Sequence, residues 1–336
     1  MTRNQKKYCI LGATSFGGRS CIESLLDEGY EVLAIARREL PNAPFNINCM
    51  QLKQLKWVTA DIVSNTAKLI SEINIFKPDY IIDFMGQGMV AQSWIFPDQW
   101  YITNIAKKSE LINGLKWENY LSKYIRISTP EVFGSVDEPI TEQHPFNPST
   151  PYALSHATID QHLMLMNNEN GFPFIISRYA NFYGPGQQIY RIIPKALFFA
   201  ISNQKLTLEG GGLSERAFIY KDDIISSLQA IIKHGTIGES YHFSDTECIS
   251  IRSLVEQIAE YCEINYENFT TIGPERKGKD QRYFMSVDKA FCSLGWKPKT
   301  SLKNGIKKTK RWISDSKNYI TPDLLSYMHV FRGSHE

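Results

Sequence analysis

Residues 127–156 read ISTPEVFGSVDEPITEQHPFNPSTPYALSH, and this stretch decides the predicted fold. An apolar strand ends at Ile127, and the chain leaves it through Ser128 and Thr129, with Glu131 two residues further on. In open parallel sheets, ligands bind outside the carboxyl ends of the strands. The sequence therefore predicts a site in which two hydroxyls and a carboxylate stand at a sheet edge.

A helix is predicted to follow the polar, proline-rich loop, beginning at Pro151 and Tyr152. Tyr152 and His156 are four residues apart, which places both side chains on one face of that helix. The two side chains can then act on the same group of atoms. We interpret the phenol and the imidazole as the second half of the site that begins at Ser128 and Thr129.

This spacing resembles that of the extended short-chain dehydrogenase/reductases that act on nucleotide sugars, whose signature is a Ser/Thr pair followed by Tyr-x-x-x-Lys. His156 stands at the lysine position. The resemblance runs from Lys7 to about Trp312. It implies an α/β fold, a Rossmann-type doubly wound parallel sheet with a smaller α/β substrate-binding lobe at the C-terminal side. It also implies an NAD(P)-dependent nucleotide-sugar epimerase or dehydratase, similar to dTDP-glucose and GDP-mannose 4,6-dehydratases.

A glycine-rich turn follows the first predicted strand, residues 7–11. Backbone N–H groups and the positive end of a helix dipole at such a turn suit a dinucleotide pyrophosphate. Family members usually show Gly-x-x-Gly-x-x-Gly, and here Ser15 replaces the middle glycine. The alternative is a plain strand-to-helix turn without a ligand. The position of the glycine-rich turn directly after a first strand favours cofactor binding. The candidate contacts are Gly12, Thr14, Ser15, Phe16 and Gly18.

The second predicted strand, residues 31–36, ends in Arg37 and Arg38 and not in the acidic residue that would bind the ribose 2′-hydroxyl of NAD. A pair of guanidinium groups suits a 2′-phosphate by charge and by bidentate geometry. The sequence therefore predicts NADP, with NAD less favoured; two solvated arginines are the alternative. After the third strand, Asp61 and Ile62 resemble the family's pair beside the adenine.

The resemblance assigns the catalytic roles. Tyr152 is the candidate base, and Thr129 or Ser128 would hold the sugar O4. A tyrosine pKa of about 10 needs a nearby cation if the phenol is to act as a base near neutrality. His156, with an ordinary pKa of about 6.5, is mostly neutral at pH 7, so it is expected to contact the nicotinamide ribose without lending a fixed positive charge.

Glu131 bears on the type of reaction, because 4,6-dehydratases and glucuronate decarboxylases of the family carry a carboxylate at this position and C4 epimerases usually do not. In a 4,6-dehydratase, oxidation at C4 acidifies the C5 proton, a glutamate removes it, water leaves from C6, and hydride returns to C6. Pro130 is a second departure, since it cannot protonate the leaving hydroxyl. A solvated loop carboxylate is the alternative role of Glu131.

Further resemblances place the substrate contacts, several of them in the C-terminal lobe. Residues 178–185 look like Arg-x-x-Asn-x-Tyr-Gly-Pro, and residues 216–223 resemble Arg-x-Phe-x-Tyr-Val-x-Asp. Arginines suit a diphosphate because their planar forks carry a fixed charge, although each alone is more often a surface residue. The candidate substrate-binding residues are Gln87, Ser93, Ser128, Asn181, Arg191, Arg216 and Arg276.

Composition narrows the classes of function. Hydrophobic residues make up 43% of the 336 residues and charged residues 21%, as in an ordinary soluble globular protein. The net charge of +2, with both signs interspersed, implies neither a nucleic-acid nor a membrane partner. The six cysteines are scattered without a C-x-x-C pair, which indicates reduced thiols, no metal site and a cytoplasmic location.

We expect an NADP-binding domain over residues 1–178 with a return segment near 217–243, a substrate lobe over 179–312, and a tail over 313–336. The tail matches nothing nameable and is expected to form a surface helix and a loose end. In the family, helices matching residues 98–114 and 152–168 pack against a second subunit. The resemblance therefore implies a homodimer.

The favoured function is an NADP-dependent 4,6-dehydratase that converts a nucleotide hexose to a 4-keto-6-deoxyhexose, as in bacterial-type surface polysaccharide synthesis. A C4 epimerase or decarboxylase of the same family is an alternative. A nucleotide-sugar binding protein with impaired catalysis is another, motivated by the departures at Ser15, Pro130 and His156.

Overall fold

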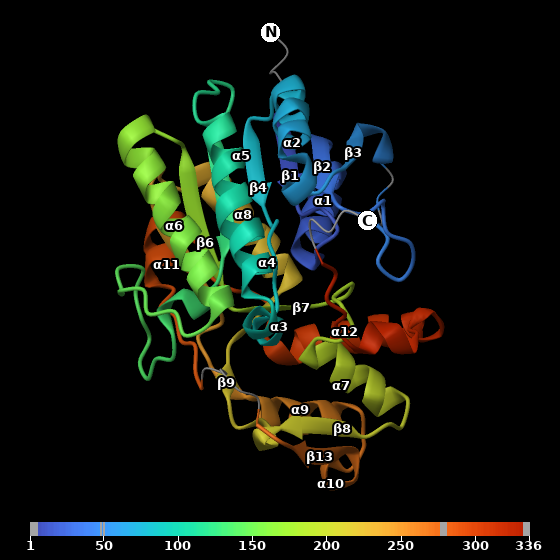
Figure 1. Ribbon diagram of the computed structural model, residues 1–336. Helices are drawn as coiled ribbons and strands as arrows, with labels where there is room; N and C mark the ends of the chain where they lie inside the picture. The colour runs from blue at the N-terminus through green and yellow to red at the C-terminus, as the bar shows by residue number, and fades with distance from the viewer. Residues whose placement is uncertain (1–5, 48, 50, 276–280, 332–336) are drawn as a thin grey trace.

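The structure is a computed structural model that describes residues 6–47, 49, 51–275 and 281–331 (Figure 1). Its centre is a parallel seven-stranded sheet with the strand order β11-β6-β5-β4-β1-β2-β3. This is the doubly wound Rossmann-type sheet that the sequence predicted. The strands are β1 (Lys7–Leu11), β2 (Glu31–Ala36), β3 (Leu55–Thr59), β4 (Tyr80–Asp83), β5 (Lys123–Ser128), β6 (Phe174–Tyr179) and β11 (Ser240–Phe243).

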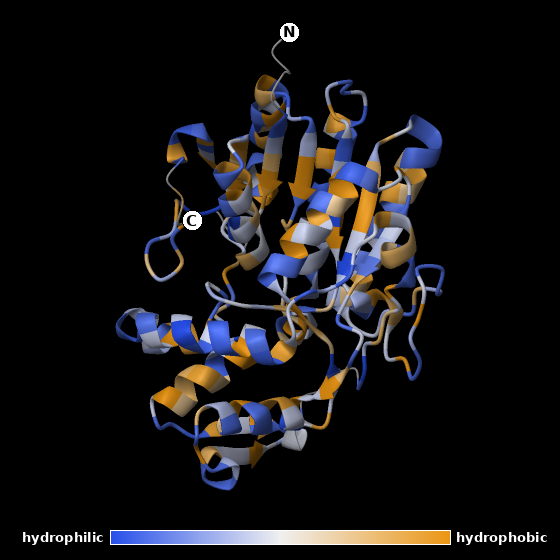
Figure 2. Cartoon of the chain, turned by 180° about the vertical axis from the view of Figure 1, so that it is seen from behind, coloured by the Kyte–Doolittle hydropathy of each residue, from blue (hydrophilic) through white to orange (hydrophobic). Residues whose placement is uncertain are grey.

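Helices cover both faces of the sheet, so its strands are buried on each side. One apolar core joins the sheet to α1 (Phe16–Asp27), α8 (Lys221–His234) and α11 (Asp288–Leu294). The opposite core joins it to α2 (Ile62–Phe76), α5 (Lys107–Leu115) and α6 (Pro151–Asn170). The strands are accordingly coloured mostly as hydrophobic in Figure 2, as expected for a parallel sheet covered on both faces.

A smaller lobe lies below the carboxyl ends of the strands (Figure 1). It has its own apolar core. Its elements are β7 (Asn181–Tyr183), α7 (Ile192–Ile201), β8 (Leu206–Glu209), β9 (Glu215–Arg216), β10 (Phe218–Tyr220), β12 (Ile249–Ser250), α9 (Ile251–Tyr261), α10 (Tyr266–Phe269), β13 (Thr270–Gly273) and α12 (Leu302–Ser316). The chain enters the lobe after β6, returns to β11 through α8, and enters the lobe again at β12.

The helical region after β4 is irregular, and Phe96 interrupts it between its first two helices. It contains α3 (Val90–Ile95), α4 (Pro97–Tyr101) and a π-helical turn at Ile102–Ala106 that leads directly into α5. The sequence predicted a single helix over residues 98–114. The π turn is the difference, and such turns are frequent at functional sites.

The chain end differs from one expectation. The helix α12 runs through the predicted boundary at residue 313 to Ser316, and the described residues 317–331 are not a loose end, because several of their side chains pack against the rest of the protein. In residues 327–331, here called the C-terminal segment, His329 stacks on Phe96 and Trp100, with ring centroids 5.2 and 5.4 Å apart. Figure 1 shows this red end of the chain rising from α12 toward the sheet. This segment carries an aromatic ring at every second residue, which places the rings on one side of an extended chain. The spacing explains why the rings pack together against the protein.

Candidate active site

The glycine-rich turn lies between β1 and α1. Gly12 has φ +76°, and a Cβ there would stand 2.8 Å from backbone atoms of Phe84 and Met85, so the position requires glycine. Ser15 has φ −67° and needs no glycine; its hydroxyl accepts a hydrogen bond from the Gly18 N–H at 3.0 Å and caps α1. The turn therefore keeps the close backbone approach that a pyrophosphate site needs. Thr14 and Phe16 lie in the same turn.

The predicted ribose contacts lie at the ends of β2 and β3. Arg37 is half-buried, and its Nε is 3.9 Å from a carboxylate oxygen of Asp61, whereas Arg38 is exposed. Asp61 also accepts the Val63 N–H at 2.8 Å and so caps α2, while Ile62 is buried beneath it. Asp61 thus offsets part of the positive charge that Arg37 could offer a 2′-phosphate.

Thr129, Tyr152, His156 and Glu131 are brought together, as the sequence predicted. Thr129 and Tyr152 share a side-chain hydrogen bond. The rings of Tyr152 and His156 have centroids 4.5 Å apart. Glu131 lies in the first turn of a short 3₁₀ helix (Pro130–Phe133), directly after Thr129, and acts electrostatically on the Tyr152 phenol. A hydroxyl, a phenol and a carboxylate therefore face one region beside β5.

The environment of Tyr152 opposes its ionisation. Burial, and then the Glu131 carboxylate, raise the pKa of the phenol well above its usual value. The hydrogen bond from Thr129 and the charges of Arg191 and Arg126 act in the opposite direction and favour the phenolate. In this structure the phenol is therefore a weak acid that needs further positive charge to become a base at neutral pH.

His156 is held as a neutral imidazole. A guanidinium has only donors, so Arg126 donates to His156 Nδ1 across 3.0 Å and the ring proton sits on Nε2. Burial lowers the pKa of His156 well below its usual value, and the charges of Arg126, Lys108 and Arg178 lower it further. The structure agrees with the expectation that this residue carries no fixed charge.

A buried charge cluster surrounds His156 and was not predicted from the sequence. Lys108 donates to both carboxylate oxygens of Asp83, at 2.7 and 2.6 Å. Arg178 donates to Asp160 at 3.0 Å. Burial disfavours the Asp83 carboxylate, but Lys108 and Arg126 outweigh this effect and hold its pKa below the usual value. The cluster consists of Asp83, Lys108, Tyr124, Arg126, His156, Asp160 and Arg178.

Two of the predicted substrate contacts make hydrogen bonds inside the protein. Ser128 donates to a carboxylate oxygen of Asp160 at 2.6 Å and is buried. Ser93 donates to the Val90 carbonyl at 2.7 Å and accepts the Tyr152 N–H at 3.2 Å. These hydroxyls hold β5 against α6 and α3 against the start of α6, so their part in substrate binding stays a prediction.

Gln87 connects three parts of the molecule. Its N–H donates to the Asn104 Oδ1 at 2.7 Å, and the Asn104 Nδ2 donates to the Gln87 carbonyl and to Ser155 Oγ, each at 3.0 Å. Its own Nε2 lies 3.0 Å from His329 Nδ1 and 3.4 Å from the Tyr327 hydroxyl. Asn104, which lies in the π-helical turn, was missed from the sequence because nothing in its local pattern marks it.

The predicted substrate contacts of the smaller lobe lie near the loop that carries Thr129. Asn181, Arg216 and Pro130 line one small hollow of about 10 Å³. Arg191 begins α7, is exposed, and acts electrostatically on Tyr152. Arg276 lies outside the described residues. The structure therefore places Asn181 and Arg216 beside the loop that carries Thr129, and Arg191 within electrostatic reach of Tyr152.

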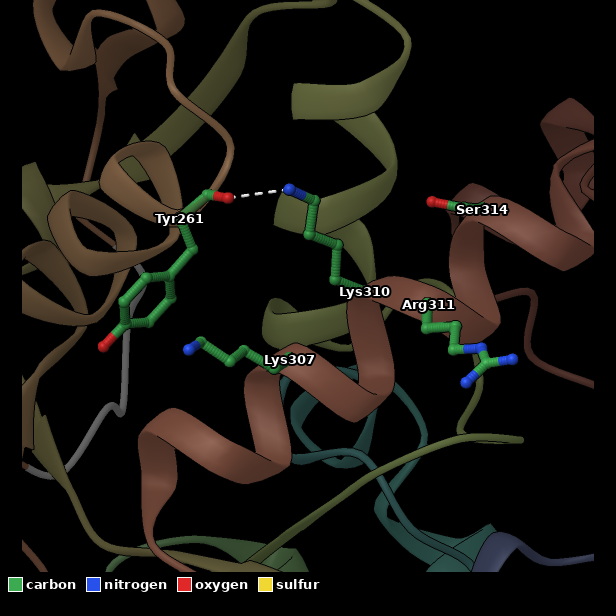
Figure 3. A pocket seen from close by; sticks show the side chains of 5 residues that line it. All are labelled: Tyr261, Lys307, Lys310, Arg311 and Ser314. Carbon is green, nitrogen blue, oxygen red and sulfur yellow. Dashed lines mark hydrogen bonds between the residues drawn. The ribbon is translucent and has the colours of Figure 1, made fainter.

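A larger hollow of about 400 Å³ lies elsewhere, between α9 and α12, and involves no predicted site residue. Figure 3 shows Lys307, Lys310 and Arg311 along α12. Lys310 donates to the Tyr261 carbonyl at 2.7 Å. Within the described part of the chain, no group of three or more His, Cys, Asp or Glu could hold a metal ion. None of the described helices has the length and apolar character that a bilayer crossing requires.

The sheet, the glycine turn at its first strand and the Thr129–Tyr152 pair define an enzyme of the short-chain dehydrogenase/reductase class. Comparison with known proteins narrows the class, since the sequence model of the GDP-mannose 4,6 dehydratase family matches residues 9–309. The chain belongs to this family. It is an enzyme of the nucleotide-sugar dehydratase/epimerase kind, as the sequence predicted.

The relatives are similar over nearly the whole chain. A human dTDP-D-glucose 4,6-dehydratase is 29% identical and covers 93% of this chain and 91% of its own length. A probable dTDP-glucose 4,6-dehydratase of Sinorhizobium fredii is 26% identical over 92% of this chain and 93% of its own. The dTDP-glucose 4,6-dehydratase DesIV of Streptomyces venezuelae, solved with NAD and TYD bound, is 25% identical, with a TM-score of 0.84 and coverage of 94% and 99%.

Proposed function

We propose that this protein is a nucleotide-sugar 4,6-dehydratase, which converts a nucleotide hexose to the 4-keto-6-deoxy sugar. The observation that carries the proposal is the hydrogen-bonded pair Thr129 and Tyr152 with the Glu131 carboxylate beside it. Relatives named as 4,6-dehydratases, which match over more than 90% of the chain, support it.

The residues take these roles in the proposal. Tyr152, in its phenolate form, accepts the proton of the sugar 4-hydroxyl, and Thr129 donates a hydrogen bond to the same oxygen. Glu131 removes the C5 proton once C4 is a ketone. Pro130, which is buried, offers no proton to the hydroxyl leaving from C6. We therefore assign the return of this proton to the departing oxygen to the same Glu131 carboxyl group.

The cofactor is proposed to be a nicotinamide dinucleotide, which supplies the hydride acceptor and donor when bound. The close backbone approach at Gly12 and the capped start of α1 fit its pyrophosphate. Arg37 and Arg38 favour NADP, whereas the DesIV structure and a Bacillus anthracis relative were solved with NAD.

Asn181, Arg191 and Arg216 are proposed to hold the nucleotide diphosphate, because Asn181 and Arg216 line a hollow with Pro130 and the charge of Arg191 acts on Tyr152. A cytoplasmic homodimer that supplies a deoxysugar for a surface polysaccharide is the setting we propose. Dimerisation is checked by light scattering at micromolar protein concentration.

Product analysis tests the proposed function. The protein is incubated with dTDP-glucose, UDP-glucose and GDP-mannose in separate reactions, and the products are examined by proton NMR. A new C6 methyl doublet with loss of the C4 proton is expected for one of them, and Tyr152→Phe should abolish it. A product inverted at C4 with its C6 hydroxyl retained would establish the epimerase instead.

A nucleotide-sugar binding protein without turnover is the second candidate. The raised pKa of Tyr152, caused first by burial and then by Glu131, favours it. This candidate predicts that a nucleotide sugar co-purifies with the protein and remains chemically unchanged after long incubation. Mass spectrometry of the bound fraction distinguishes it from the dehydratase.

A further inference from the structure

The buried cluster contains one more positive charge than negative charge. Lys108 contacts Asp83 at 2.6 Å and Arg178 contacts Asp160 at 3.0 Å, so each carboxylate has its own close cation. Arg126 is the third cation. Its guanidinium lies 3.7 Å from Asp83 and 3.8 Å from Asp160, longer than either paired contact. The surplus positive charge of this cluster is therefore centred on Arg126.

The shortest contact of Arg126 in this cluster is with His156. One terminal nitrogen donates to His156 Nδ1 at 3.0 Å, and the imidazole ring in turn lies against the Tyr152 ring, 4.5 Å between centroids. All three side chains are fixed on regular elements, since Arg126 belongs to β5 and the other two to α6. A neutral imidazole thus separates a buried guanidinium from the phenol.

We propose that Arg126, held behind the neutral His156, supplies part of the positive charge that makes Tyr152 usable as a proton acceptor. The inference rests on the proposed function, in which Tyr152 accepts the proton of the sugar hydroxyl. Arg126 is a positioning residue. Its guanidinium stays protonated, His156 keeps its proton on Nε2, and no bond forms or breaks at either residue.

The same geometry explains why a histidine suits position 156. An ammonium group there would stand beside Arg126 in a cluster that already carries a surplus positive charge, and like charges at close range in a buried site repel strongly. A neutral acceptor removes this repulsion and satisfies a guanidinium donor. The charge at this site therefore comes from the strand and not from the helix.

Other charged groups also face Tyr152 and His156 and bear on the pH dependence of the site. Asp83 comes from β4, Lys108 from α5, Asp160 from α6 and Arg178 from β6. Glu131 from the short 3₁₀ helix raises the pKa of Tyr152 after burial, and Arg191 from the start of α7 lowers it, as does Arg126. Any test must leave these groups unchanged.

The test is a double-mutant cycle at positions 126 and 156 of the full-length protein. Arg126→Met should lower kcat at pH 7 at least tenfold, with KM changed less than threefold, and move the rise of the pH–rate profile upward by at least one pH unit. Arg126→Lys should restore most of the rate, because it keeps the charge. An unchanged pH profile in Arg126→Met would overturn the proposal.

The second part of the test measures the thermal stability of the variants and does not depend on the substrate. His156→Lys should lower the melting temperature, and Arg126→Met combined with His156→Lys should recover both stability and activity. A double variant that is no more stable than His156→Lys alone overturns the charge relation, even if Arg126→Met itself fails to fold. A wild type that turns over none of the sugars tested would contradict the proposed function, while this stability arm remains decisive for Arg126.

Discussion

In the proposed dehydratase chemistry, Glu131 is the base that removes the C5 proton. It follows Thr129 by two positions and acts on Tyr152. Exchange of Glu131 for glutamine removes the base for the C5 proton and leaves Tyr152 in place. We expect 4-keto-6-deoxy product to fall at least 100-fold in Glu131→Gln, with loss of solvent deuterium uptake at C5 by mass spectrometry.

Reduction of the cofactor at 340 nm should remain detectable in the same variant, since oxidation at C4 does not require Glu131. Glu138→Gln is the matched control, because Glu138 lies in the following loop and is exposed. Normal turnover by Glu131→Gln would make the residue a bystander and favour epimerase chemistry.

Arg37 and Arg38 differ in their surroundings, and this difference can be tested by cofactor titration. We expect NADP to bind at least tenfold tighter than NAD, which corresponds to about 1.4 kcal/mol. Arg38→Ala should remove most of that preference, because the Arg37 charge is partly offset by Asp61 at 3.9 Å. Isothermal titration measures both affinities. Equal affinities in the wild type would show that these arginines do not select for the 2′-phosphate, and tighter binding of NAD would show a preference for NAD.

At the scale of single elements, sequence reasoning was most successful where one local rule decided the outcome. The strands β1 and β2 begin and end at the predicted residues, because short apolar runs adjoin turn-forming sequence. Cluster residues such as Asp83 and Arg126 were missed, since pairing across five elements leaves no local pattern. A charged residue within a strand of a doubly covered sheet was the available signal, because such a side chain must find a buried partner.

The C-terminal segment gives a prediction at the same scale. Tyr327 lies against Gln87 and acts electrostatically on Arg37, and His329 contacts Gln87 and stacks on two aromatic rings. A dinucleotide that needs Arg37 must compete with this segment. We expect His329→Ala to tighten cofactor binding about three- to tenfold, roughly 0.7–1.4 kcal/mol, measured by fluorescence titration.

Met328→Ala is the control for the segment, because the Met328 side chain is 71% exposed between the two contacting residues. It should leave cofactor affinity unchanged. Weaker binding by His329→Ala would show that the imidazole belongs to the cofactor site and that the segment closes over the dinucleotide.

For the whole molecule, the sequence identified the sheet and its smaller lobe through the strand–turn–helix order and the family resemblance. It did not place the chain end, because the docking of residues 327–331 depends on Phe96 and Trp100, which precede them by more than 200 positions. From sequence alone, a polar and aromatic terminus is predicted to be a surface segment, because the residues against which it packs are not known. Long-range packing of short segments is thus the part of this structure that local rules could not supply.

Acid stability is a property of the whole molecule that follows from its buried histidines. Burial lowers the pKa of both His156 and His242 well below the usual value, with nearby cations adding to the effect. Below about pH 6.5, these histidines therefore bind protons in the unfolded chain but not in the folded chain. The stability that the two neutral histidines contribute is fully present above that pH. It is lost as the pH falls toward their pKa values in the folded protein.

The free energy of unfolding should decline by about 1.4 kcal/mol per pH unit for each histidine, or about 2.7 kcal/mol for both, below pH 6. Urea titrations between pH 5 and 7.5 measure this slope. Glu142 has the opposite effect on stability, because burial raises its pKa above the ordinary value of 4.5 and the folded chain then binds its proton more readily than the unfolded chain. The decline in the free energy of unfolding should therefore flatten at the acid end of the range. His242→Asn should halve the slope, whereas His234→Asn should not, because His234 is exposed. A slope that His242→Asn leaves unchanged would mean that His242 is protonated in the folded protein.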